Sequence, residues 1–208
     1  MTPREDLEET RKGQIVEAAS KVFARKGLQK ARMDDIVDES GLSKGALYWY
    51  FKSKDEIIDA LLKKFLDREL QALEKIQQAK GPTAERIQDF VNLVVADIQN
   101  LKYFSSISFE FYAMALRSKR IQKLFTEYFN RFKEVITPII EQGIREGEFR
   151  NVNSLEVVVA IGALIEGTIL LYAFDPVAID IEKYVNSGMN LILNGLLANG
   201  SKESNGGR

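Results

Sequence analysis

Apolar residues recur along most of this sequence at intervals of three and four, the spacing that gathers side chains on one face of an α-helix. The first such segment covers about residues 5–26, and its stripe includes Ile15, Val22 and Phe23 before Gly27 ends it. The same spacing predicts eight further helices, at about residues 33–40, 44–51, 54–79, 83–101, 104–117, 121–146, 154–174 and 180–198. The pattern therefore predicts an all-α protein of about nine helices.

Several polar residues stand where these helices should begin or bend. Ser43 is suited to cap the helix that starts at Lys44, and Ser53 with Glu56 has the spacing of a capping box. Pro138 removes a backbone donor inside its segment, so we expect a bend there. The Gly/Ser/Asn-rich end, residues 199–208, is expected to be disordered.

Two short helices joined by a tight turn, residues 33–51, have the layout of a helix-turn-helix. Five apolar residues are spaced to close a small core between them: Ile36, Val37, Leu42, Leu47 and Phe51. This leaves a second face with Lys44, Ala46, Tyr48 and Trp49 on it or near its rim. In a DNA major groove, Lys44 could reach a phosphate or a guanine edge and Ala46 a thymine methyl. The alternative is that Tyr48, Trp49 and Tyr50 are core aromatics of a three-helix bundle.

Charge favours the DNA interpretation weakly. The 208 residues carry a net charge of −1, yet residues 25–54 hold seven cations against four anions. A local cationic surplus is the electrostatic footprint that nucleic-acid binding requires.

Composition narrows the chemistry. The sequence has no cysteine and no histidine, which excludes disulfides and thiolate zinc sites and removes the usual general base. We find no P-loop, nucleophile–base pair or metal-ligand cluster, so neither enzyme activity, a metal nor a cofactor is expected. The apolar segment 157–174 is about long enough to span a membrane, but Glu166 at its centre favours a buried helix. We expect a cytoplasmic protein without a membrane segment.

A longer motif resembles a known family. The stretch from Ile36 to Asp55, IVDESGLSKGALYWYFKSKD, is similar to the DNA-binding part of TetR/AcrR bacterial regulators, and so are Ile15–Ala19, Phe23 and Gly27 upstream. The match covers about residues 11–57 without a gap; beyond it only the helical layout agrees. The resemblance implies a helix-turn-helix DNA-binding domain at residues 1–53 and a ligand-binding and dimerisation bundle at residues 54–198.

The resemblance also implies roles for individual residues. Ser43, Lys44 and Gly45 would open the recognition helix near the bases. Tyr48 and Tyr50 would contact phosphates or bases, with Trp49 beside them and Ala46 on the same helix, and Lys54 would bind a phosphate. At Arg32 this sequence departs from the family, which has Thr or Ser before the second helix. We expect Arg32 to have exchanged helix capping for a phosphate contact, although the cap could instead be lost or shifted.

The segment from residue 104 to 132 is dense in aromatic residues. Such spacing is typical of a helix core, but the density favours a cavity for a small apolar or aromatic ligand. The candidate ligand-binding residues are Phe104, Phe109, Glu110, Tyr112, Phe125, Tyr128, Phe129 and Glu166. The carboxylates among them could orient the ligand or neutralise a cationic one.

The helices at about 154–174 and 180–198 are the best candidates for self-association. The first is apolar on nearly every side, so one of its faces needs cover from outside its own bundle. The resemblance implies a four-helix seam in a homodimer and a palindromic operator. The sequence thus predicts a repressor that a ligand releases from DNA; activation, a protein-binding adaptor and an enzyme are the alternatives.

Overall fold

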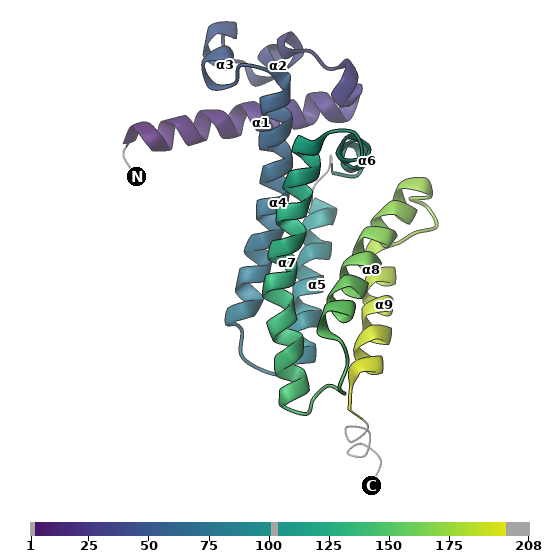
Figure 1. Ribbon diagram of the computed structural model, residues 1–208. Coiled ribbons are helices and arrows are strands. Elements are labelled where there is room, and N and C mark those ends of the chain that lie inside the picture. The colour runs from purple at the N-terminus through teal and green to yellow at the C-terminus, as the bar shows by residue number, and fades with distance from the viewer. Residues whose placement is uncertain (1–2, 101–103, 199–208) are drawn as a thin grey trace. The chain divides into compact units, whose positions relative to one another are not determined.

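The computed structural model describes residues 3–100 and 104–198, and these ranges form nine helices (Figure 1). The helices are α1 (Pro3–Lys30), α2 (Met33–Ser40), α3 (Lys44–Tyr50), α4 (Lys54–Gln78), α5 (Thr83–Asn100), α6 (Phe104–Ala115), α7 (Lys119–Arg145), α8 (Ser154–Phe174) and α9 (Ile181–Leu196). The predicted all-α fold is confirmed, and most predicted boundaries agree to within two residues. The predicted disordered end, residues 199–208, lies outside the described residues.

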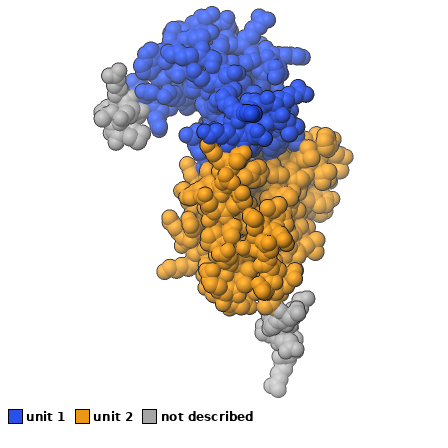
Figure 2. All heavy atoms as spheres, viewed as in Figure 1, with its two compact units in different colours: residues 1–67, 101–125 blue, residues 68–100, 126–208 orange. Residues whose placement is uncertain are grey.

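Packing divides the chain into two compact units (Figure 2). Unit 1 comprises residues 1–67 and 101–125, and unit 2 comprises residues 68–100 and 126–208. Helices α4 and α7 each contribute to both units, and α6 belongs to unit 1. The functional division predicted at residues 53/54 therefore does not coincide with the packing units.

The core of unit 1 forms where the apolar stripe of α1 meets the short helices and the first half of α4. Ile15, Val22, Ile36 and Leu47 are fully buried. Removing a Val, Leu or Ile side chain from water contributes roughly 1.5–3 kcal/mol, so these few contacts hold α2 and α3 on α1. Helix α1 bends at Gly27, whose φ of +76° interrupts the helical conformation where the sequence predicted an end.

In unit 2 the apolar faces of α5, α8 and α9 pack together, and Figure 1 shows α8 and α9 side by side. A Cβ added to Gly188 of α9 would lie 2.4 Å from a methyl carbon of Leu164, so any larger residue there would force the Leu164 side chain to move. Arg86 is buried and donates to the carbonyl oxygen of Ile76 (3.0 Å) and to Oε1 of Gln142 (3.0 Å). Its guanidinium thereby ties the end of α4 to α5 and α7.

The loop between α7 and α8 fastens the end of α9. Phe149 forms an isolated β-bridge with Leu197, and its ring covers Gly143, where a Cβ would come within 2.5 Å. The amide of Arg150 donates to the carbonyl oxygen of Leu196 (2.8 Å), and the amide of Ala198 donates to the carbonyl oxygen of Glu148 (3.0 Å).

The capping of α4 and the course of α7 at Pro138 differ in detail from the expectation. Ser53 does accept a hydrogen bond from the amide of Glu56 (3.3 Å), but the Glu56 carboxylate accepts from the amide of Lys52 (2.7 Å). The reciprocal bond is thus shifted by one residue from the predicted capping box. At Pro138, α7 continues as one helix from Lys119 to Arg145.

By length and hydropathy alone, α8 could cross a membrane, and about a third of its apolar window is buried. Its buried stripe, which includes Val158, Ile161 and Ile165, faces the interior of unit 2, as expected of the core helix of a bundle.

Candidate nucleic-acid interface and ligand cavity

The turn between α2 and α3 is built by a glycine and a serine. Gly41 ends α2 in the left-handed conformation, with φ of +67°. Ser43 caps α3 as predicted, since its hydroxyl oxygen accepts a hydrogen bond from the amide of Ala46 (3.2 Å). Ile36 and Leu47 have no exposed surface, so the inner faces of both helices are fixed against the core. The opposite face of α3 is consequently held outward.

That outward face carries the cation and the aromatics that the sequence singled out. Lys44, Tyr48 and Trp49 are exposed, Trp49 with 56% of its surface free, whereas Ala46 and Tyr50 are half-buried. The rings of Trp49 and Tyr50 meet edge to face, with centroids 4.6 Å apart. Tyr48 and Trp49 are therefore not core residues of the three-helix bundle.

Lys44 is engaged in an ion pair that the sequence did not predict. Its ammonium lies 2.7 Å from a carboxylate oxygen of Asp34 on α2. The hydrogen bond and the negative charge of Asp34 raise the pKa of Lys44. The pair keeps the lysine protonated but partly neutralises its field.

Arg32 precedes α2 with an exposed side chain that makes no capping hydrogen bond. Instead, its backbone amide donates to the carboxylate of Asp35 (2.9 Å), which also accepts from the ammonium of Lys26 (2.6 Å). Both hydrogen bonds lower the pKa of Asp35, and the bond from Lys26 has the larger effect. The capping role has moved to Asp35, which leaves the Arg32 guanidinium available at the surface.

Lys54 is placed differently from the expectation. Its ammonium donates to the carbonyl oxygens of Leu28 (2.7 Å), Gln29 (3.0 Å) and Ala31 (2.9 Å). Because an ammonium has only three donors, all of them are used within unit 1. The structure thus gives Lys54 a positioning role at the end of α1 rather than a free charge for phosphate.

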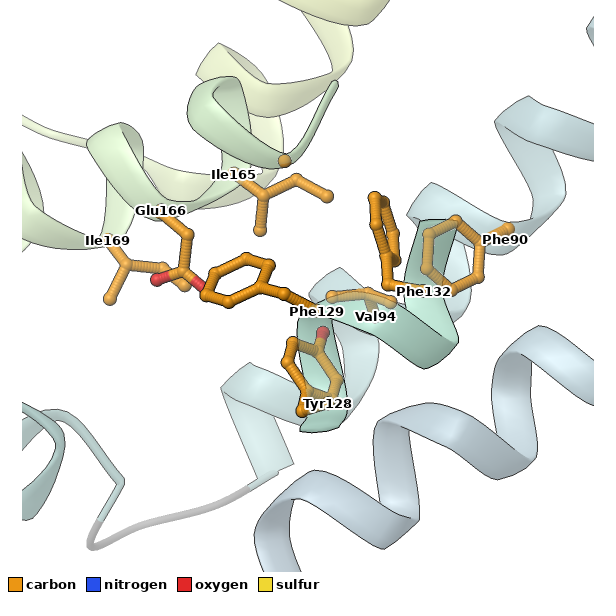
Figure 3. Close-up of a pocket in the computed structure, with 9 residues that line it drawn as sticks. Phe90, Val94, Tyr128, Phe129, Phe132, Ile165, Glu166 and Ile169 are labelled. Carbon is orange, nitrogen blue, oxygen red and sulfur yellow. The ribbon is translucent and has the colours of Figure 1, made fainter. Parts of the chain in front are cut away.

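Unit 2 contains an apolar cavity between α7 and α8. A groove of about 380 Å³ is lined by Phe129, Phe132, Lys133, Val158, Val159, Gly162, Ala163 and Glu166. A smaller recess shares Phe129, Phe132, Gly162 and Glu166 with it and reaches Phe90 and Val94 of α5. Figure 3 shows the rings of Tyr128 and Phe129 with the Glu166 carboxylate beside Phe129. Aromatic and aliphatic walls with only two charged side chains, Glu166 and Lys133, suit a small, largely apolar ligand.

The structure separates the predicted ligand-binding residues into two groups. Tyr128, Phe129 and Glu166 line the recess in unit 2. Phe109, Tyr112 and Phe125 lie in unit 1, where the Tyr112 ring packs on that of Phe109 and on that of Phe125, with centroids 6.0 and 5.4 Å apart.

Two further candidates remain. Glu110 accepts a hydrogen bond from the amide of Leu28 (2.7 Å), and the side chain of Phe104 lies outside the described residues. Sequence reasoning missed Phe90 and Val94 as cavity residues, because their spacing on α5 is also that of an ordinary core helix.

The exposed sides of α8 and α9 are apolar to an unusual degree. The large hydrophobic side chains exposed there are Leu155, Val159, Leu170, Leu171, Phe174, Tyr184 and Leu191. Single exposed apolar residues are normal, but several large ones on two neighbouring helices are typical of an interaction surface. Among the described residues, no three His, Cys, Asp or Glu side chains gather as metal ligands would.

Comparison with known proteins agrees with this architecture. Residues 15–61 match the model of the tetR family of bacterial regulatory proteins, and residues 83–192 match that of the C-terminal part of BetI-type transcriptional repressors. The HTH-type transcriptional regulator YfiR of Bacillus subtilis is 28% identical over 158 residues, which are 74% of this chain and 77% of YfiR.

Solved structures share the fold. A transcriptional regulator from Saccharomonospora viridis in complex with choline has a TM-score of 0.79 at 21% identity. The match covers 91% of this chain and 98% of the S. viridis protein. FadR from Bacillus subtilis in complex with stearoyl-CoA has a TM-score of 0.70 at 20% identity, over 88% of this chain and 98% of FadR. The two family models together span both the outward-facing helix-turn-helix and the helical cavity. The chain belongs to the tetR family of bacterial regulatory proteins and is a DNA-binding transcriptional repressor.

Proposed function

We propose that the protein acts in the cytoplasm as a homodimer that binds a palindromic operator and leaves it when a small apolar or aromatic ligand binds. The observation that carries the DNA-binding part is the outward face of α3, where Lys44, Tyr48 and Trp49 are exposed while Leu47 is fully buried. A stable protein gains nothing from exposing these aromatics beside a cation unless the face meets a partner.

In the complex, α3 lies in the major groove. Lys44 reaches a guanine edge or a phosphate, Ala46 meets a thymine methyl, and Ser43 and Gly45 lie close enough for main-chain contacts. The hydroxyls of Tyr48 and Tyr50 donate to phosphates, with Trp49 packing beside them. The exposed guanidinium of Arg32 binds a phosphate at the start of α2. Lys54 contributes indirectly, by holding the end of α1.

The exposed apolar sides of α8 and α9 form the homodimer interface. Two copies joined there by a two-fold axis present two recognition helices to DNA, about 34–36 Å or slightly more apart. Two matched half-sites then bind together, which explains why a dimer prefers a palindromic operator.

The ligand binds in the cavity of unit 2, against Tyr128 and Phe129, with Glu166 as its polar contact. Choline and stearoyl-CoA occupy two proteins of the same fold, so the fold accepts ligands of very different size. A ligand that prefers the unbound conformation by about 1.4 kcal/mol lowers operator affinity tenfold. Helix α4, which belongs to both units, offers a covalent route for this coupling.

The test begins with a duplex that the wild-type protein selects from a random-sequence pool. We expect Lys44→Ala and Tyr48→Ala each to weaken binding to this duplex by roughly 1–3 kcal/mol, with the helical content and the dimer unchanged. Lys63→Ala is the matched control, because Lys63 is an exposed lysine of α4 away from α3. Unchanged affinity in both α3 variants, or failure of the wild-type protein to select any duplex, would refute the proposal and favour a protein-binding adaptor.

A further inference from the structure

The last turn of α1 is held by two charged side chains that come from other helices. Glu110 of α6 accepts a hydrogen bond from the backbone amide of Leu28 (2.7 Å). Lys54 of α4 donates to the carbonyl oxygens of Leu28, Gln29 and Ala31. One carboxylate and one ammonium thus satisfy opposite ends of the same short stretch of backbone, directly before α2.

The kink at Gly27 explains why this stretch needs an external cap. After the kink a new helical turn begins, in which the amide of Ala31 donates to the carbonyl of Gly27 (3.2 Å). The first amides of such a turn have no partner within the helix, and a carboxylate is a favourable cap for them. Glu110 supplies that carboxylate from a residue 82 positions away in the chain.

Gly27 is matched to this carboxylate in two ways. Its φ of +76° lies in the left-handed region, which side chains with a Cβ adopt at a cost. A Cβ at this position would also lie 3.1 Å from Oε1 of Glu110, closer than ordinary contact. The kink, the glycine and the carboxylate therefore form one local arrangement.

The segment that carries Glu110 is itself firmly attached within unit 1. Ile107 and Phe111 of α6 are buried, and the Phe111 ring meets that of Phe65 of α4 edge to face, with centroids 6.4 Å apart. Arg120, at the start of α7, donates to the carbonyl of Asp55 (3.2 Å) and forms an ion pair with Asp59. The helix that carries Glu110 is therefore held in place while its carboxylate contacts the end of α1.

We propose that Glu110 is a positioning residue for operator binding. By capping the turn after Gly27, it fixes the angle between the last turn of α1 and the helix-turn-helix that follows. The link is short, because α1 ends at Lys30 and α2 begins at Met33, with the buried Ala31 in between. Loss of the Glu110 cap frees the last turn of α1 and lets α2 and α3 change their angle. The inference rests on the proposed binding to paired half-sites, where such an angle determines which half-site spacing fits.

Glu110→Gln in the full-length protein tests this role. The amide keeps the shape of the side chain but loses the negative charge that strengthens the bond to the Leu28 amide. Glu74→Gln is the matched control, since Glu74 is an exposed glutamate of α4. Affinity is measured for the duplex selected by the wild-type protein, for versions with one base pair added or removed between the half-sites, and for unrelated DNA.

We expect Glu110→Gln to bind the selected duplex about tenfold more weakly, while its affinity for the two altered spacings and for unrelated DNA stays within about twofold of wild type. Amide hydrogen exchange at Leu28 should become faster. The same affinities as wild type, or an equal loss on all four duplexes, would overturn the proposal, because a purely structural role lowers all affinities together.

Should Glu110→Gln fail to fold, Glu110→Asp keeps the charge but shortens the reach by one methylene, and an intermediate loss of spacing preference is expected. Failure of the proposed function looks different: the wild-type protein would then select no duplex from the pool.

Discussion

The ammonium of Lys44 and a carboxylate oxygen of Asp34 lie 2.7 Å apart, joining the first residue of α3 to the first turn of α2. Both side chains are mostly exposed. A cation on the proposed recognition helix is therefore already paired before DNA arrives, and a phosphate or a guanine must compete with Asp34 for it.

Asp34→Asn is expected to strengthen DNA binding by about threefold to tenfold at low salt. The substitution releases Lys44 and removes a negative charge that repels phosphates. Titration of a labelled duplex at two salt concentrations measures the effect, which should shrink at the higher salt. Weaker binding would show instead that Asp34 is needed to orient Lys44.

Arg32→Thr should make the dependence of binding on salt less steep, by about one unit in the log–log slope, because one phosphate contact is lost. The thermal midpoint should hardly change, since the cap of α2 uses the Arg32 backbone amide and the Asp35 carboxylate. An unchanged salt slope would show that Arg32 does not touch phosphate.

The pairs that hold α1 to α2 predict a loss of stability in acid. Hydrogen bonds from Lys26 to Asp35 and from Arg25 to Glu39 lower the pKa of both carboxyl groups in the folded protein. Their contribution is fully present above the ordinary values of about 3.9 and 4.3 and is lost as the pH falls through the lowered ones. Urea unfolding from pH 6 to pH 3 should show a smaller decline for Asp35→Asn than for wild type. Equal declines would mean that this pair does not contribute.

Leu170→Glu should dissociate the proposed homodimer. Leu170 is a half-exposed apolar residue on α8, and a carboxylate buried in the interface would be unpaired. We expect dimer affinity to fall about a hundredfold or more and operator affinity with it, as measured by light scattering and DNA titration. Leu116→Glu is the control, because Leu116 is exposed after α6. Dissociation by both variants would argue against α8 as the interface.

Phe129→Ala should lower the affinity for a neutral apolar dye, Nile red, by about tenfold, because it removes one aromatic wall of the cavity. Phe125→Ala should leave dye binding unchanged, since Phe125 packs on Tyr112 in unit 1. The reverse order of effects would move the ligand site to the predicted residues of unit 1, which are Phe109, Tyr112 and Phe125. DNA binding by Phe129→Ala without ligand should equal that of wild type.

The fold could be predicted because its signals are local. Gly27 and Ser43 each mark a helix end through their own backbone or capping chemistry, and the structure has a kink at the first and a helix boundary at the second. The exposed face of α3 followed from the spacing of Ile36 and Leu47 in the same way. Such features depend on neighbours within a few residues.

The partners of the charged side chains could not be predicted, because they lie far apart in sequence. Nothing in the spacing of Glu110 distinguishes a ligand contact from a cap on Leu28, which is 82 positions away. Lys54 likewise meets three carbonyls more than 20 positions upstream. The division of the aromatic segment between two units, near residue 125, also depends on packing that the helical period does not encode.

The β-bridge between Phe149 and Leu197 sets a practical limit for engineering this repressor. A fusion partner or purification tag joined after Ala198 leaves both flanking hydrogen bonds in place. A chain cut at Gly195 loses the carbonyl of Leu196 and the amide of Ala198, and with them both hydrogen bonds that join the end of α9 to residues 148 and 150. Residue 198 is therefore the earliest safe junction for a chimera that keeps the C-terminal helices intact.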